Sequence, residues 1–166
     1  MCADATSNEL AVSWAAGPYA TIPLIEEMYE AARTPIPELR SHAPELGTVA
    51  ARRAGQLVGW ATVYPATPGP AIVQHLYLPR EIHRLTQGFY DDEPPTAEER
   101  ELVVALYRRA AEHARAAGLR ALEWGDADQG PGHDATMTLG ARAVEVEKAS
   151  ALGLSWREHV RYRLDL

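Results

Sequence analysis

The sequence predicts one α/β domain, in which a mixed, mostly antiparallel and twisted sheet of about six or seven strands is flanked by helices. Three observations indicate this class. The chain has 166 residues, the usual size of one domain. Short alternating apolar segments, separated by glycine and proline, recur along it. Residues 96–117 have the apolar spacing and end signals of a long helix. We expect one domain over residues 1–166, with a flexible tail at 1–8.

The N-terminal half predicts a strand, a helix and a three-strand meander. Thr34-Pro35 ends the helix, because a residue before proline avoids helical dihedral angles. Gly55 supplies the positive φ that the hairpin turn needs. Residues 80–95 have no clear period and predict an atypical loop insertion. In chain order the expected elements are a strand at 10–14, a helix at 19–33, hairpin strands at 48–53 and 57–64, and a strand at 71–78.

The C-terminal half begins with the clearest helix. Thr96-Ala97-Glu98-Glu99 is a capping box, in which Thr96 caps the amide of Glu99 and the Glu99 side chain reaches back. Gly118 follows the last turn, where a left-handed residue commonly ends a helix. The elements expected after it are a strand at 119–124, a short helix at 133–139 that ends at Gly140, and strands at 143–152 and 158–166.

Composition and charge exclude several classes of protein. The net charge is −7 and no basic stripe with interleaved aromatics occurs, so we expect no nucleic-acid partner. No apolar run approaches about 18 residues, so we expect no membrane span. Residues 1–5 lack the pattern of a secretory signal. Cys2 is the sole cysteine, which excludes an intrachain disulfide. We expect a cytoplasmic protein, and the sequence leaves its oligomeric state, including a homodimer, open.

Four short motifs, in this order, carry a family resemblance. They are Leu57-Val58-Gly59-Trp60-Ala61, Leu76-Tyr77-Leu78-Pro79, Gly118-Leu119-Arg120-Ala121-Leu122 and Thr138-Leu139-Gly140-Ala141. With the order of elements, they resemble the GNAT superfamily of N-acetyltransferases over nearly the whole chain. The resemblance implies splayed fourth and fifth strands and acyl transfer from acyl-CoA to an amine. It also implies that backbone amides around Leu76 and Leu78 hold the acyl carbonyl, with Arg80 and Arg84 near the coenzyme phosphates.

The sequence departs from this family where the coenzyme diphosphate would bind. Residues 80–88 contain one glycine and do not match the family's [RQ]-x-x-G-x-[GA] loop. Carboxylates follow at Asp91, Asp92, Glu93, Glu98, Glu99 and Glu101. Like charges about 6 Å apart repel by roughly 3 kcal/mol at an effective dielectric of 20. A helix dipole attracts an anion by only about 0.3–1 kcal/mol. We therefore expect weak binding of acyl-CoA, and the family's frequent catalytic tyrosine is replaced by Thr136.

Candidate catalytic residues lie on two predicted strands. Alternation in 71–78 places His75 and Tyr77 on one face and Gln74 on the other. His75 could accept a proton from a substrate amine, or it could be a half-buried histidine satisfied by a neighbouring strand. A carboxylate at Glu123, in the middle of a strand, needs either a catalytic role or an ion-pair partner. The two partners that the sequence suggests are Arg120 and Arg142.

A substrate pocket could be lined by Trp60, Tyr64, Trp124 and Asp126. Aromatic residues on strands are more often part of the core, and turn aspartates are more often solvated. His133-Asp134, near Asp126, supplies metal-ligand types but no known spacing, so we expect no metal site. Asp134 fits better as the N-cap of the short helix.

Three functions are compatible with these residues. The first is an acyltransferase-like enzyme that acts on a small-molecule amine. The second is an enzyme that uses the same cleft without CoA and closes it with residues 80–95. The third is a non-catalytic protein that binds a small molecule. The fold alone does not choose among them.

Overall fold

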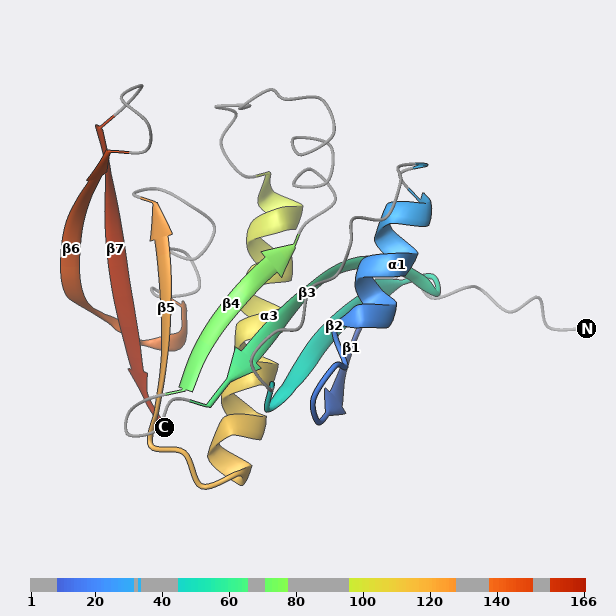
Figure 1. The fold of residues 1–166 in the computed structure, drawn as a ribbon, viewed down its shortest axis with the longest axis horizontal. Helices are drawn as coiled ribbons and strands as arrows, with labels where there is room; N and C mark the ends of the chain where they lie inside the picture. The colour runs from blue at the N-terminus through green and yellow to red at the C-terminus, as the bar shows by residue number, and fades with distance from the viewer. Residues whose placement is uncertain are drawn as a thin grey trace, which may run out of the picture.

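The computed structural model describes residues 9–31, 33, 45–65, 71–77, 96–127, 138–150 and 156–166. Within these residues the chain forms one seven-stranded sheet and two helices that lie on it (Figure 1). In chain order the elements are β1 (Leu10–Ala16), α1 (Ile22–Ala31), β2 (Gly47–Arg53), β3 (Gln56–Tyr64), β4 (Ala71–Tyr77), α3 (Ala97–Ala116), β5 (Ala121–Ala127), β6 (Arg142–Ser150) and β7 (Trp156–Asp165). The predicted α/β class is confirmed.

The strand order in the sheet is β1-β2-β3-β4-β5-β7-β6. Every neighbouring pair is antiparallel except β4 and β5, which run parallel. A parallel neighbour requires a crossover, and α3 lies within the connection from β4 to β5. The mixed, mostly antiparallel sheet that the sequence predicts is therefore confirmed.

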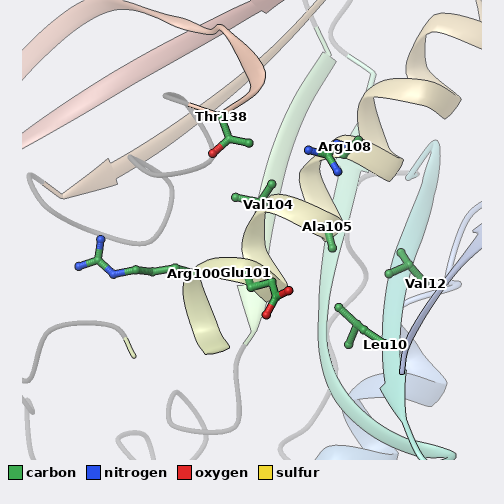
Figure 2. Close-up of a pocket in the computed structure, with 8 residues that line it drawn as sticks. All are labelled: Leu10, Val12, Arg100, Glu101, Val104, Ala105, Arg108 and Thr138. Atoms are coloured by element: carbon green, nitrogen blue, oxygen red, sulfur yellow. The ribbon is translucent and has the colours of Figure 1, made fainter. Parts of the chain in front are cut away.

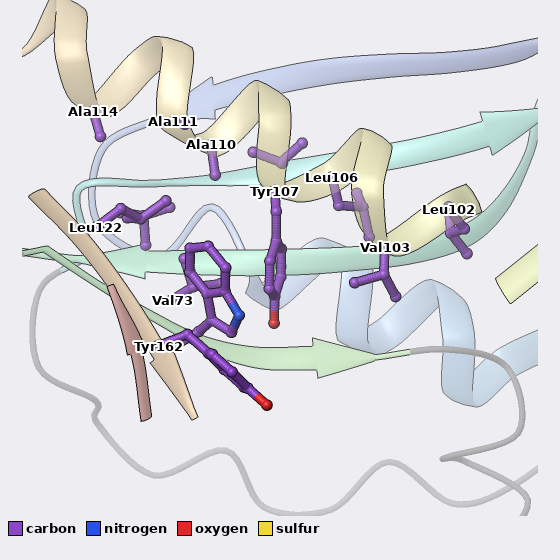
Figure 3. Close-up of a cluster of buried hydrophobic side chains, with 14 of the residues drawn as sticks. Val73, Leu102, Val103, Leu106, Tyr107, Ala110, Ala111, Ala114, Leu122 and Tyr162 are labelled. Carbon is purple, nitrogen blue, oxygen red and sulfur yellow. The ribbon is translucent and has the colours of Figure 1, made fainter. Parts of the chain in front are cut away.

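The two helices cover opposite faces of the sheet. Apolar residues of α3 recur at helical spacing and point onto the sheet (Figure 3), where they pack on alternate residues of the strands. On the other face, Met28 of α1 packs against Leu57 and Trp60 of β3. The side chains that α3 buries are Leu102, Val103, Leu106, Tyr107, Ala110, Ala111 and Ala114.

Both ends of α3 follow the sequence signals. Thr96 Oγ1 accepts a hydrogen bond from the Glu99 amide at 3.2 Å, and Glu99 Oε1 accepts one from the Thr96 amide at 3.1 Å. The capping box is therefore confirmed. Gly118 has φ +83°, so the helix ends in the left-handed conformation that a glycine adopts without strain. The amide of Leu119 then bonds the carbonyl of Ala114 at 3.0 Å, and β5 starts at Ala121 rather than at 119.

Other predicted boundaries shift where the backbone has a positive φ. The helix predicted over 19–33 is shorter, because Tyr19 (φ +68°) and Arg33 (φ +52°) have dihedral angles that no α-helix includes. In the β2–β3 turn Gly55 has φ +78°, as predicted, and Ala54 also has a positive φ of +50°. The predicted tail at 1–8, the loop at 80–95 and most of the helix at 133–139 lie outside the described residues.

Candidate functional site

The candidate site is the space where β4 and β5 separate. The two strands pair at only two positions, Ala71 with Leu122 and Ile72 with Glu123. Beyond these pairs the strands diverge toward their carboxyl ends (Figure 1), while β5 continues to pair with β7 along its whole length. Among the described strands, none pairs with the β5-facing edge of β4 past Ile72. Backbone groups on that edge are therefore not paired with any of the described strands.

The register of β4 also changes before the strand ends. Gln74 pairs with Thr62 and Tyr77 pairs with Trp60, so three steps along β4 lie opposite two steps along β3. This irregularity inserts one residue into β4, as a β-bulge does. The side chains of residues 74–77 lie outside the described part of the structure, so the placement of His75 and Tyr77 on one face of β4 stays a prediction.

Glu123 lies at the vertex of this separation and is nearly buried, with 12% of its side chain exposed. Its Oε1 lies 3.6 Å from Arg163 Nη1, and its Oε2 lies 3.9 Å from Arg161 Nε, both on β7. The partners suggested from the sequence, Arg120 and Arg142, are wrong. The β5–β7 register aligns Glu123 with Arg163, and Arg142 lies one strand further away, where it pairs with Arg163.

Arg161 also holds a second carboxylate. Its Nη2 lies 2.6 Å from Glu145 Oε2 on β6. The ion pairs therefore extend from the vertex across β7 to β6, on residues that lie far apart in the sequence. Sequence reasoning missed Arg161 and Glu145, because only the register of the last two strands brings them together.

The amino-terminal end of α3 lies at the end of the sheet toward which β4 and β5 separate (Figure 1). Two of its amides, those of Thr96 and Glu99, are already engaged in the capping box. Pro94 and Pro95, which precede Thr96, have no amide hydrogen to donate. This end therefore offers a diphosphate fewer donors than a helix N-terminus whose amides are all free, although helix N-termini usually attract anions.

Two of the carboxylates at the head of α3, those of Glu98 and Glu99, have local partners that reduce the repulsion expected from the sequence. Glu98 Oε1 lies 3.3 Å from Arg53 Nε, and Glu99 is engaged with the Thr96 amide. Each carboxylate is thus partly compensated by a local partner.

The aromatic residues predicted to line a substrate pocket are placed differently. Trp124 is 1% exposed, with its ring 4.9 Å from that of Tyr107 and 6.4 Å from that of Tyr162, so it is part of the core under α3. Trp60 is fully buried beneath α1. Tyr64 is partly buried at the end of β3.

The other predicted site residues are described only in part. The backbone of β4 includes His75, Leu76 and Tyr77, and Asp126 of β5 pairs with Val160. Leu78, Arg80 and Arg84 lie outside the described residues.

A buried polar cluster lies between α1 and the sheet, and the sequence did not indicate it. Thr21 Oγ1 lies 2.7 Å from Thr48 Oγ1 and 2.8 Å from Thr62 Oγ1. The Thr21 amide donates to the buried carboxylate of Glu45 at 3.4 Å. Thr62 pairs with Gln74 of β4, so the cluster is one strand away from the diverging edge. Because threonine is common in strands, the presence of Thr48 and Thr62 on β2 and β3 did not indicate that they meet Thr21.

The described residues also form a groove of about 580 Å³ on the outer side of α3 (Figure 2). None of the residues that line it belongs to β4 or β5. No group of three or more metal-binding side chains occurs in the described part of the chain. None of the described helices has the length and apolar character that crossing a membrane requires.

Comparison with solved structures gives the fold a name. The chain superimposes on an acetyltransferase of the GNAT family from Streptococcus pneumoniae with a TM-score of 0.60 and 13% identity, over 95% of this chain and 100% of the other. A probable acetyltransferase from Staphylococcus epidermidis gives a TM-score of 0.60 at 12% identity, over 95% and 99% of the two chains. The protein has the GNAT acetyltransferase fold.

A third GNAT-like neighbour contains a coenzyme. It is a putative acetyltransferase from Salmonella typhimurium with its cofactor acetyl-CoA, at a TM-score of 0.57 and 15% identity, over 95% of this chain and 94% of the other. No family model and no curated protein sequence matches this GNAT-fold chain. The similarity therefore concerns the fold. In this chain β4 and β5 separate after two paired positions, as the resemblance had predicted.

Proposed function

We propose that this GNAT-fold protein transfers an acyl group from a thioester to a small-molecule amine in the space between β4 and β5. The observation that carries this proposal is the loss of pairing after Ile72 and Glu123, which leaves one edge of β4 unpaired among the described strands. An extended acyl-thioester arm can hydrogen-bond such an edge as a further strand would. The acetyl-CoA complex of the Salmonella typhimurium neighbour supports the same class of donor.

The reaction needs a base and a place for the thioester carbonyl. The neutral amine attacks the carbonyl carbon, a C–N bond forms, and the C–S bond breaks as the thiol leaves. The nitrogen loses one proton, and the thiolate gains one. We assign His75 or Glu123 to receive the proton from nitrogen, with Tyr77 as a candidate donor to sulfur. Leu76 and Leu78 contribute the strand amides proposed to hold the carbonyl.

The diphosphate of CoA fits the head of α3 less well than the acyl arm fits β4. The amides of Thr96 and Glu99 are taken by the capping box, and two prolines precede them. We infer that acyl-CoA binds weakly, with Arg80 and Arg84 as the remaining candidates to contact its phosphates. The same shortage of donors favours, as the second candidate, a CoA-independent enzyme or small-molecule binding protein that uses the cleft.

A thiol-release assay with a panel of small primary amines tests the proposal. The donors are acetyl-CoA and acetyl-pantetheine, which share the thioester arm but differ in the diphosphate. The proposal expects amine-dependent thiol release from at least one donor, with the acetylated amine identified by mass spectrometry. Absence of release from both donors at millimolar concentration would reject acyl transfer in favour of the second candidate.

A further inference from the structure

The two edges of the sheet differ in charge. Among the described strands, β1 and β6 each have a neighbour on one side only. β6 carries Arg142, Glu145, Glu147 and Lys148, and its register shifts between Ala143 and Glu145. Charges and bulges are the features by which natural edge strands avoid pairing with another chain. The edge at β6 is therefore protected.

The edge at β1 has none of these protections. Residues Leu10–Ala16 contain no charge and no proline. They pair with β2 over seven consecutive positions without a register shift. A regular uncharged edge of this length presents backbone donors and acceptors to any strand that approaches it.

An apolar strip continues from this edge toward α3. Leu10 and Val12 of β1 are only partly buried, and they line the groove together with Val104 and Ala105 of α3 (Figure 2). When a second apolar strip covers apolar surface beside an open strand edge, the free energy of association becomes more favourable. The groove and the edge therefore form one continuous surface, which we call the β1 surface.

We propose that the β1 surface binds a second copy of this chain, through antiparallel pairing of the two β1 strands. A twofold axis perpendicular to the sheet keeps α3 of both copies on the same side and extends the sheet across the dimer. Antiparallel pairing within Leu10–Ala16 opposes no two charged residues, in any register. The pairing uses the β1 edge of both copies. The other edge among the described strands is β6, whose charges oppose pairing, so the assembly stops at two copies.

The charges of the groove support the same partner. Glu101 and Arg108 line it two helical turns apart, and Arg100 lies beside Glu101. The twofold axis reverses their order, so Glu101 of one groove lies toward Arg108 of the other. The β1 surface is thus complementary to itself in backbone hydrogen bonding, in apolar character and in charge.

The mass in solution, measured by sedimentation equilibrium, tests this dimer. The wild-type chain is expected near twice 18.2 kDa. Ser13→Lys adds an exposed lysine to β1, and it should cause loss of the dimer by placing like charges on the two paired strands. Ala143→Lys adds the same charge at an exposed position of β6, and it should leave the dimer intact. A monomeric wild type, or a Ser13→Lys variant that remains dimeric, would overturn the proposal.

A second measurement does not depend on folding of the variant. Amide hydrogen exchange in the peptide that covers Leu10–Ala16 is compared at high and low concentrations of the wild type. Protection that increases with concentration supports β1 pairing. Protection that does not change with concentration contradicts it. Neither test requires acyl transfer, so the dimer and the proposed activity can fail separately.

Discussion

Ile72 of β4 and Glu123 of β5 are the last residues paired before these two strands separate. The point at which the two strands separate therefore carries a nearly buried carboxylate, which is paired with Arg161 and Arg163 of β7. These ion pairs connect β5, β7 and β6 to the position at which we propose that acyl transfer occurs. A change at Glu123 should affect activity more than stability.

Glu123→Gln removes that carboxylate charge and retains the shape of the side chain. If Glu123 receives the proton from the amine, kcat/KM should fall by about 100-fold or more. The free energy of unfolding should change by less than about 1 kcal/mol, because both arginines are partly exposed. Steady-state kinetics and urea unfolding measure the two effects.

Glu145→Gln is the matched control, since Glu145 pairs with the same Arg161 but lies on β6, away from the vertex. Its kcat/KM should remain close to that of the wild type. Equal losses in both variants would show that the ion pairs matter only for the structure. Unchanged kinetics in Glu123→Gln would remove Glu123 as a base.

His75→Ala tests the other candidate base, which lies on β4, the strand that separates from β5. A lost general base should lower kcat by about 100-fold and remove the acidic limb of the pH–rate profile. Gln74→Ala, at the preceding position, provides the comparison and should keep that limb. A pH–rate profile in His75→Ala with its acidic limb intact would argue that His75 is a structural residue.

Thr21→Val should destabilise the protein although it changes little volume. The Thr21 hydroxyl lies within hydrogen-bond distance of both Thr48 and Thr62, and all three residues are buried. Removing it leaves buried hydroxyls with fewer partners, at a cost of about 1–3 kcal/mol. Thr138→Val, at an exposed position, should change the free energy of unfolding by less than about 0.5 kcal/mol. Equal values for the two variants in urea unfolding would mean that the cluster does not stabilise α1 on the sheet.

Thr96→Ala should shorten or loosen the head of α3. The side chain of Thr96 caps the Glu99 amide, and its loss should cost about 1 kcal/mol of unfolding free energy. Thr96→Ser retains the hydroxyl and should recover most of this loss, as thermal unfolding would report. Failure of serine to recover it would indicate that the threonine methyl group, not the cap, stabilises this end.

The stability of the protein should fall as the pH decreases through the histidine range. His113 stacks on Trp14 with ring centroids 4.5 Å apart, and burial, aided by Arg109, lowers its pKa below 6.5, although Glu112 opposes the shift. The unfolded chain therefore binds the proton first, and stability is lost as the pH falls below 6.5 toward the pKa of the folded state. Glu27 also has a lowered pKa, through its hydrogen bond with Arg52, but its contribution is lost only below 4.5.

His113→Phe separates these two contributions, because it keeps an aromatic ring beside Trp14 and cannot be protonated. Its Tm should decrease less than that of the wild type between pH 7 and pH 5, where histidine titrates and most carboxylates remain charged. Parallel Tm curves for the two proteins over this interval would contradict the assignment to His113.

The sequence predicted those parts of the fold that depend on local signals. The capping box at Thr96 and Glu99 and the left-handed Gly118 involve residues within a few positions of one another, so their geometry follows from the sequence. The separation of β4 from β5 was expected from the family resemblance rather than from any single residue. It is now visible in the register of Ile72 and Glu123.

The parts of the site that failed depend on register. The extra residue in β4 between Gln74 and Tyr77 has no glycine or proline to mark it, so alternation alone could not detect it. The arginine partners of Glu123 are brought near only by the pairing of β5 with the last strand of the sheet. Trp60 and Trp124 have the same sequence pattern whether they line a pocket or fill a core, and only burial distinguishes the two.

The most direct test of the proposed site is calorimetric titration of the protein with acetyl-CoA and with acetyl-pantetheine. If the edge of β4 holds the thioester arm and the head of α3 contributes little to the diphosphate, the two ligands should bind with similar affinity. For acetyl-CoA we expect a Kd above about 100 μM, which corresponds to a binding free energy weaker than about −5.5 kcal/mol. A low-micromolar Kd for acetyl-CoA, lost when the diphosphate is removed, would contradict this account of the head of α3.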